Sequence, residues 1–190
     1  MNATIGFAMC GSFCTFSRAV AQIERLKDEG YNVIPIMSET AAGVDTRFGA
    51  ARDYIDRIEK ITGNNVISSI RGAEPIGPKK MCDLIIVAPC TGNTLAKLAL
   101  GITDSAVTMA VKSHLRINRP TLLCVASNDG LGASAQNIGR LLNTKNIFFV
   151  PMSQDDYVNK PKSLVGHFEL IPECVEKVLK GVQPQPIFRG

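Results

Sequence analysis

The sequence contains no tryptophan, only two histidines and no long apolar run. The longest unbroken apolar stretches, residues 84–88 and 122–126, fall far short of the roughly 18 residues that a membrane-spanning helix needs, so we expect no membrane span. A zinc site needs clustered ligands, but the histidines are His114 and His167, and Cys10 and Cys14 have no second pair at zinc-finger spacing. We therefore expect no bound metal.

Charge and the N-terminal sequence narrow the range of partners and compartments. The 21 Lys and Arg against 17 Asp and Glu give a formal net charge of +4, and the basic residues form no stripe with aromatic neighbours. We therefore expect no nucleic-acid partner, since a small anionic ligand explains the excess equally well. Residues 1–4 show neither a basic leader nor a small-residue cleavage site, which predicts a cytoplasmic protein with reduced cysteines.

Short apolar runs alternate with amphipathic stretches along the chain. The runs are continuous, as expected for parallel strands that are covered on both faces. They occupy residues 5–9, 33–37, 84–88, 121–126 and 147–150. Helical periodicity is found between and after them, at residues 17–29, 48–61, 94–100, 105–115, 135–142 and 172–179. This order predicts one three-layer α/β domain over residues 1–190, with a flexible tail from about residue 183. The Gly-, Pro- and Lys-rich residues 70–80 are also expected to be weakly ordered.

Small and polar residues follow each predicted strand, where an open parallel sheet collects its ligands. These segments are residues 10–12, 38–40, 89–94, 127–130 and 151–156. The segment at 89–94 leads directly into a helix, whose free N–H groups and positive dipole end favour a phosphate or another anion. The alternative is that Thr91 or Asn93 only caps that helix.

Two groups of glycines can be compared with known nucleotide-binding motifs. Gly6 and Gly11 have P-loop spacing, but Ser12 and Phe13 follow where a P-loop needs Lys and then Ser or Thr. The stretch 130–135 reads Gly-x-Gly-x-x-Ala between a strand and a helix, which is a weak dinucleotide fingerprint, because residues 127–130 intervene after the strand. Turn glycines are the alternative interpretation.

Several of these segments together resemble a known family. Residues 89–94 read Pro-Cys-Thr-Gly-Asn-Thr and residues 101–104 read Gly-Ile-Thr-Asp, while Gly11-Ser12 and Ser38 follow the first two strands. This pattern is similar to that of the homo-oligomeric flavin-containing cysteine decarboxylases, whose relatives include phosphopantothenoylcysteine decarboxylase and the flavin prenyltransferases. The resemblance covers most of the chain. It implies a Rossmann-like, flavodoxin-like fold, FMN bound at a subunit interface, and a homo-oligomer built from trimers, either a trimer or a dodecamer.

The resemblance and the strand ends together define the expected cofactor contacts. The residues expected to bind FMN are Gly11, Ser12, Phe13, Ser38, Pro89, Cys90, Thr91, Gly92, Asn93, Thr94, Ser127 and Asn128.

The sequence also departs from the decarboxylases. Residues 68–80 hold no histidine where the family has a catalytic one, and residues 126–133 lack the family's Trp-containing substrate clamp. A different substrate is implied. Residues 151–164 resemble a sporulation subgroup of the family, which implies oxidation of a small cyclic dicarboxylate to pyridine-2,6-dicarboxylate. The resemblance further implies a separate NAD(P)-type partner protein and the cytoplasm of a sporulating mother cell.

A dianionic substrate needs cationic partners, and the C-terminal segment offers them. The candidate catalytic residues are Lys160, Lys162, Asp155 and Asp156. The lysines would hold carboxylates, and the aspartates would orient the lysines or act as a base; the alternative for all four is solvated surface charge. Arg47 and Arg71 are further cationic candidates. His114 is expected at a surface or an interface on the helix at 105–115, without a catalytic role.

Two other function classes stay open at this point. One is a flavin prenyltransferase or an unusual decarboxylase, favoured by the Pro89-Cys90 pair and by the tyrosine, basic and Pro-x-Ser elements of residues 157–163. The other is a non-catalytic module that binds flavin or anchors a partner protein, which the missing histidine permits. Turnover of a prenyl phosphate would identify the first, and FMN binding without turnover would identify the second.

Overall fold

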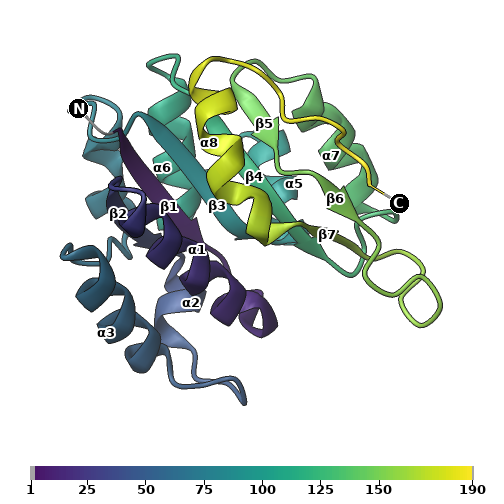
Figure 1. Cartoon of the computed structure of the whole chain (residues 1–190), viewed down its shortest axis with the longest axis horizontal. Helices are drawn as coiled ribbons and strands as arrows, with labels where there is room; N and C mark the ends of the chain where they lie inside the picture. Colours follow the sequence, from purple (N-terminus) through teal and green to yellow (C-terminus); the bar gives the residue numbers. More distant parts are fainter. Residues whose placement is uncertain (1–2, 190) are drawn as a thin grey trace.

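The structure is a computed structural model that describes residues 3–189, and it shows one α/β domain with a central sheet between two layers of helices (Figure 1). Its strands are β1 (Thr4–Met9), β2 (Asn32–Met37), β3 (Leu84–Cys90), β4 (Thr121–Ser127), β5 (Ile147–Phe149), β6 (Met152–Ser153) and β7 (Leu164–Gly166). Its helices are α1 (Phe16–Asp28), α2 (Glu39–Gly43), α3 (Ala51–Thr62), α4 (Ile70–Ala73), α5 (Gly92–Leu100), α6 (Ala106–Leu115), α7 (Ser134–Leu142) and α8 (Ile171–Leu179), with 3-10 turns η1 (Phe13–Thr15), η2 (Glu74–Ile76) and η3 (Phe168–Leu170).

The strand order confirms the predicted flavodoxin-like α/β class. The first five strands lie in the order β2-β1-β3-β4-β5 and all run parallel. The chain leaves β1 toward β2 on one side and returns to β3 on the other, so the sheet has its topological switch point between β1 and β3. Loops at the carboxyl ends of those two strands therefore diverge and leave a crevice, which is where open α/β sheets bind ligands.

An antiparallel hairpin extends the sheet and was not predicted from the sequence. Strand β7 pairs with the end of β4 and with β6, and the loop of residues 154–163 between β6 and β7 projects from the body of the domain (Figure 1). The strands are two and three residues long, too short to produce a recognisable alternation of apolar and polar side chains. Their pairing with β4 is a long-range contact.

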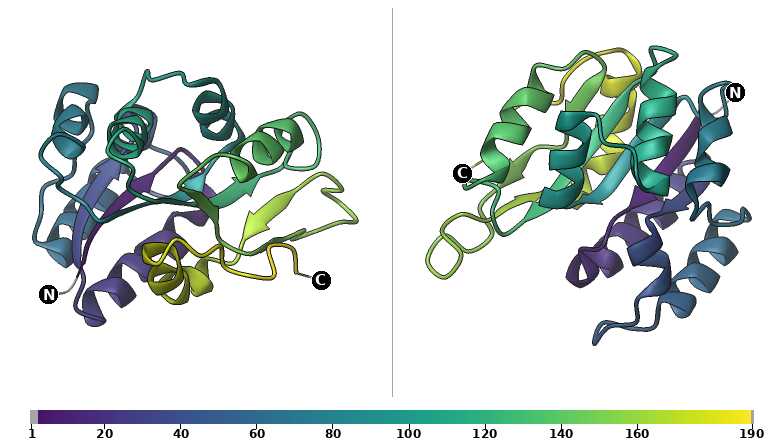
Figure 2. Two further views of the ribbon diagram at one scale, coloured as in Figure 1. Left: turned by 90° about the horizontal axis from the view of Figure 1, so that it is seen from above. Right: turned by 180° about the vertical axis from the view of Figure 1, so that it is seen from behind.

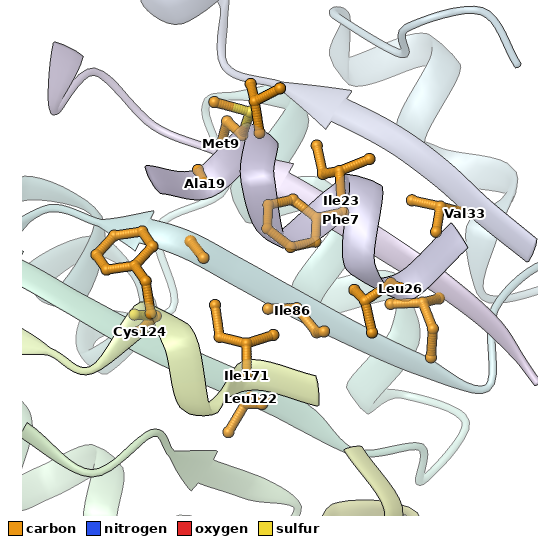
Figure 3. Close-up of a cluster of buried hydrophobic side chains, with 14 of the residues drawn as sticks. Phe7, Met9, Ala19, Ile23, Leu26, Val33, Ile86, Leu122, Cys124 and Ile171 are labelled. Atoms are coloured by element: carbon orange, nitrogen blue, oxygen red, sulfur yellow. The ribbon is translucent and has the colours of Figure 1, made fainter. Parts of the chain in front are cut away.

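Each face of the sheet carries its own apolar core. Side chains of β1 alternate, so Phe7 and Met9 enter the layer below α1 and α8, whereas Ala8 and Cys10 enter the layer below α5, α6 and α7. Figure 2 shows the helices on both sides of the sheet, and Figure 3 shows the first core, where Phe7 lies among side chains of α1 and β3. Burying one such side chain stabilises the fold by about 2 kcal/mol.

The packing of α6 corrects two expectations. His114 was expected at a surface or an interface, but its side chain is wholly buried within the domain. Helix α6 also packs against α4 and η2. The same contact orders residues 70–80, which were expected to be weakly ordered: the Ser113 hydroxyl accepts from the Gly77 N–H (2.7 Å) and donates to the Glu74 carbonyl (2.8 Å). No Cβ would fit at Gly77, because it would clash with the Ser113 carbonyl.

The C-terminal tail lies along β5 and β6. The Gln183 side chain bonds both the N–H (2.9 Å) and the carbonyl (2.7 Å) of Phe149, and the Arg189 N–H donates to the Met152 carbonyl at 3.0 Å. The flexibility expected from residue 183 stays a prediction. Within residues 3–189, none of the helices is both long and apolar enough to cross a lipid bilayer.

Candidate functional site

Three loops at the carboxyl edge of the sheet form a polar cavity of about 520 Å³. Gly11 and Ser12 follow β1, and residues 91–93 follow β3. Ser127 is the last residue of β4, and Asn128 follows it. The parallel strands bring these distant segments to one edge, and the cavity opens beside the switch point between β1 and β3. Seven of the residues expected to contact FMN therefore line one cavity.

A second cavity of about 600 Å³ continues from the first toward β2. It shares Gly11, Thr91 and Asn93 with the first and adds Ser38, which caps α2 by accepting from the Ala41 N–H at 3.2 Å. Thr94 also lines it. The two cavities together form an elongated site across the ends of β1, β2, β3 and β4. Backbone, hydroxyl and amide groups line it together with the charged side chains of Glu39, Lys97, Asp104 and Asp129.

The loop that enters α5 contains one residue that caps the helix, Thr91, and one whose side chain can contact a ligand, Asn93. The Thr91 hydroxyl accepts from the Thr94 N–H (3.3 Å) and caps the helix, and Thr94 in turn donates to the Cys10 sulfur (3.1 Å). Asn93 is exposed, and within residues 3–189 its side chain has no hydrogen-bond partner. The N–H groups of Gly92 and Asn93 belong to the first helical turn, where no intrahelical acceptor exists. This turn can therefore bind an anion, as the sequence predicts.

Close packing requires glycine at position 92. A Cβ there would lie 2.7 Å from the Ser134 hydroxyl and 3.0 Å from the Ser127 hydroxyl, both of which line the first cavity. Any side chain at this position would fill the space between the ends of β3 and β4. Gly11 is less constrained, since the nearest atom to a Cβ there would be 3.5 Å away.

Three residues expected to contact FMN lie outside these cavities. Pro89 and Cys90 are buried within β3, and the Pro89 carbonyl accepts from the Cys10 N–H at 3.3 Å, which ties the ends of β1 and β3 together. Phe13 packs on Phe16, with ring centroids 5.1 Å apart. These three residues therefore pack behind the loops and do not line the cavities.

The buried thiols are unsuited to nucleophilic chemistry. Burial raises the pKa of Cys10 to about 11 and that of Cys90 well above its usual value, so both stay protonated near neutral pH. Cys14 is the exposed cysteine among the six, all of which are free.

A third cavity, of about 280 Å³, lies between the start of α1 and the β6–β7 loop. It shares four residues with the first cavity, so the two are adjacent: Ser12, Ala126, Ser127 and Asn128. Of the four candidate catalytic residues, Asp155 and Lys160 line this cavity.

Hydrogen bonds hold Asp155 in its ionised form. Lys160 Nζ lies 3.3 Å from Asp155 Oδ2, and the Ser163 hydroxyl donates to the other carboxylate oxygen. Partial burial raises the pKa of Asp155, but the bonds from Ser163 and Lys160 outweigh it and leave the pKa below its usual value. The carboxylate therefore orients Lys160 and is a weak base.

The remaining charged candidates lie away from the cavities. Asp156 accepts from the Asn159 N–H at 3.0 Å and closes the turn of the β6–β7 loop, and these bonds lower its pKa. Lys162 is exposed on the same loop, and Arg47 and Arg71 are exposed elsewhere. None of these four lines any of the three cavities at the sheet edge.

The glycines of the weak dinucleotide fingerprint are explained by a turn. A Cβ at Gly130 would lie 2.6 Å from Leu164, and one at Gly132 would clash with the Asp129 carboxylate. The Leu131 N–H donates to the Lys162 carbonyl at 2.8 Å, which fixes this turn against the start of β7. Close packing within this turn thus accounts for both glycines.

One residue of the third cavity was missed by the sequence analysis. Arg18 lines it from α1, and its guanidinium lies 4.7 Å from the centre of the Phe168 ring and 3.6 Å from the Glu169 carboxylate. A single arginine in an amphipathic helix carries no motif, and its proximity to residues 155–160 is created only by the fold.

The fold and the site define a flavodoxin-like α/β protein with a polar crevice at its switch point, and the sequence comparison assigns the family. The chain belongs to the Flavoprotein family, whose sequence model matches residues 1–182. It is 45% identical over 183 residues to the B subunit of dipicolinate synthase from Bacillus subtilis (strain 168), covering 96% of this chain and 92% of that one. The resemblance predicted from the sequence is thereby confirmed.

Solved structures agree with this assignment. The crystal structure of the B subunit of dipicolinate synthase from Bacillus halodurans C superposes with a TM-score of 0.91 at 40% identity, covering 100% of this chain and 99% of that one. DmrB of Burkholderia xenovorans, a cubic protein cage solved in complex with FMN, superposes with a TM-score of 0.71 at 18% identity, covering 95% and 97% of the two chains. The latter likeness shows the fold alone.

Proposed function

We propose that this chain is the FMN-binding subunit of a dipicolinate synthase, an oxidoreductase that forms pyridine-2,6-dicarboxylate from a dihydrodipicolinate-type precursor during sporulation. It would act with a separate NAD(P)-type protein, the A subunit of that synthase, and would assemble into a trimer or dodecamer in the cytoplasm of the mother cell. The observation that carries the proposal is the continuous polar crevice across four strand ends, in a chain 45% identical to the B subunit of a dipicolinate synthase.

The crevice fits a phosphate-bearing flavin in its chemistry. Hydroxyls of Ser12 and Ser38, the amide of Asn93 and the first-turn N–H groups of α5 are the donors available for a phosphate and a ribityl chain. Gly92 keeps the space between the ends of β3 and β4 free of a side chain. When bound, FMN supplies a two-electron acceptor for aromatising the dihydropyridine ring.

Charged groups near the crevice suit a dicarboxylate. Lys160 lines the cavity beside Ser127 and Asn128, and Asp155 fixes its ammonium. In this proposal Lys160 binds a substrate carboxylate. Lys162 and Asp156 lie on the same loop but outside the cavity, where Asp156 closes the turn. A dianion with one carboxylate on Lys160 would lie next to the flavin crevice, because the two cavities share four residues.

An assay with the partner protein tests the proposal. The purified chain, loaded with FMN, is combined with the NAD(P)-type partner and its precursor, and pyridine-2,6-dicarboxylate is measured chromatographically. We expect product formation to require both chains and FMN. Turnover of prenyl phosphate or release of carbon dioxide from a cysteine peptide would instead identify a relative's chemistry, and bound FMN without any effect on product formation would identify a non-catalytic module.

A further inference from the structure

We propose that the 280 Å³ cavity between α1 and the β6–β7 loop is the dicarboxylate site, with Arg18 and Lys160 as its two cationic walls. This inference rests on the proposed function and specifies where and how the substrate binds. Arg18 comes from α1 and Lys160 from the β6–β7 loop, so the two cations face the cavity from separate elements. A volume just below the roughly 300–1,000 Å³ of drug-sized sites suits one substituted ring.

Arg18 is held in place by contacts that leave donors available. Its guanidinium stacks on Phe168, and its ion pair with Glu169 is long, at 3.6 Å. Among residues 3–189, most of its five N–H donors are therefore free for a ligand. Glu169 itself is paired with the His167 ring at 3.0 Å. A planar guanidinium that is already positioned can bind a carboxylate through two parallel hydrogen bonds.

Lys160 is positioned in a comparable way. Asp155 binds its ammonium at 3.3 Å, and the Ser163 hydroxyl holds Asp155 from the other side. Both cations are about half exposed, at 45% for Arg18 and 48% for Lys160, so their internal ion pairs are weak and a substrate carboxylate can bind beside them or replace them.

The apolar part of the cavity lining suits a ring. Ala126 on β4 and Val165 on β7 are cross-strand partners, and both line the cavity. They provide a small apolar surface, bordered by Ser12 and Ser127, against which a planar ring can lie. Two cations from separate elements, together with an apolar surface in the same cavity, match a ring that carries two carboxylates better than a compact phosphate.

Cys14 provides a direct readout of this site. It lines the same cavity and is exposed, whereas the other five cysteines are buried. Burial also raises the thiol pKa of all five buried cysteines, so an alkylating reagent near neutral pH reports on Cys14. Loss of fast labelling in Cys14→Ser identifies the reporting thiol.

The experiment measures the rate of Cys14 alkylation in the FMN-loaded full chain as pyridine-2,6-dicarboxylate is added, with pyridine-2-carboxylate as the ligand control. We expect saturable protection by the dicarboxylate and at least tenfold weaker protection by the monocarboxylate. Arg18→Gln and Lys160→Gln should each raise the half-protecting concentration about tenfold, since each removes a charged hydrogen-bond partner. Arg57→Gln removes a similarly exposed helical arginine outside the cavity, and Lys145→Gln an exposed lysine; neither should change protection.

The outcomes separate this inference from the proposed function. If FMN binds but the dicarboxylate does not slow the alkylation of Cys14, the substrate site is elsewhere and the inference is overturned. The same holds if the dicarboxylate protects Cys14 in Arg18→Gln and Lys160→Gln as well as in the unmodified chain. If FMN fails to bind while the dicarboxylate still protects Cys14 in an Arg18-dependent manner, the inference stands and the flavoprotein proposal fails. A thermal melt of each variant confirms that it is folded.

Discussion

The exposed amide of Asn93 offers a test that separates cofactor binding from folding. Its side chain lines both large cavities and has no hydrogen-bond partner within residues 3–189, so Asn93→Ala removes no contact that the fold uses. The free energy of unfolding should change by no more than about 0.5 kcal/mol. One or two lost hydrogen bonds to the flavin would cost about 1–2 kcal/mol of binding, which corresponds to a roughly fivefold to thirtyfold rise in Kd.

Flavin fluorescence titration and chemical unfolding of the same preparations provide the two readouts. Asn143→Ala is the matched control, because Asn143 is also exposed at a helix end and lies outside the cavities. Thr91→Ala is the opposite case, since it removes the helix cap and should lower the free energy of unfolding by about 1 kcal/mol. An unchanged Kd in Asn93→Ala would refute the reasoning, and so would a loss of stability as large as that of Thr91→Ala.

Three further predictions concern sterics, pH and the core. Gly92→Val should weaken FMN binding at least tenfold in the same titration, because a side chain would clash with the Ser134 and Ser127 hydroxyls; retained affinity would contradict the cavity geometry. Burial lowers the pKa of His114 from 6.5 to about 4, so the unfolded chain takes up a proton first as the pH falls, and stability should drop by about 3 kcal/mol between pH 6.5 and 4 in urea unfolding. His114→Leu should flatten that part of the pH profile, and an unaltered profile would show that His114 is not the group responsible. Phe7→Ala should destabilise the domain by about 3–5 kcal/mol, and a smaller loss would mean that the core relaxes around the cavity.

Local patterns were sufficient for the parallel part of the fold. Buried strands in a doubly covered sheet are continuous apolar runs, and for this reason the expected strands lie within two residues of β1 to β5. Helix ends marked by glycine, such as Gly63 and Gly101 in the left-handed conformation, were also predictable. The hairpin of β6 and β7 was not, because its short strands are specified by pairing with β4.

The same division applies to the site. Residues that follow strands converge whatever their side chains are, so Gly11, Asn93 and Ser127 could be grouped from the sequence alone. The third cavity depends on how the β6–β7 loop folds back toward α1, which no local pattern encodes. Sequence reasoning therefore could not distinguish Lys160 from Lys162, and it overlooked Arg18.

The burial of His114 could not be predicted from the sequence either. The helix at 105–115 was predicted correctly, but which of its faces is covered depends on α4 and η2, which come from a Gly- and Pro-containing stretch with no helical periodicity. Burial lowers the pKa of this histidine, so the imidazole is held as a neutral core side chain.

Binding of FMN to the cofactor-stripped protein tests the central claim most directly. Titration of the chain into FMN, followed by fluorescence and the visible spectrum, should show saturable quenching and shifted flavin bands in the unmodified chain, with weaker binding in Asn93→Ala. No binding at high micromolar FMN, both alone and in the presence of the partner protein, would contradict the account and reduce the family relationship to one of fold.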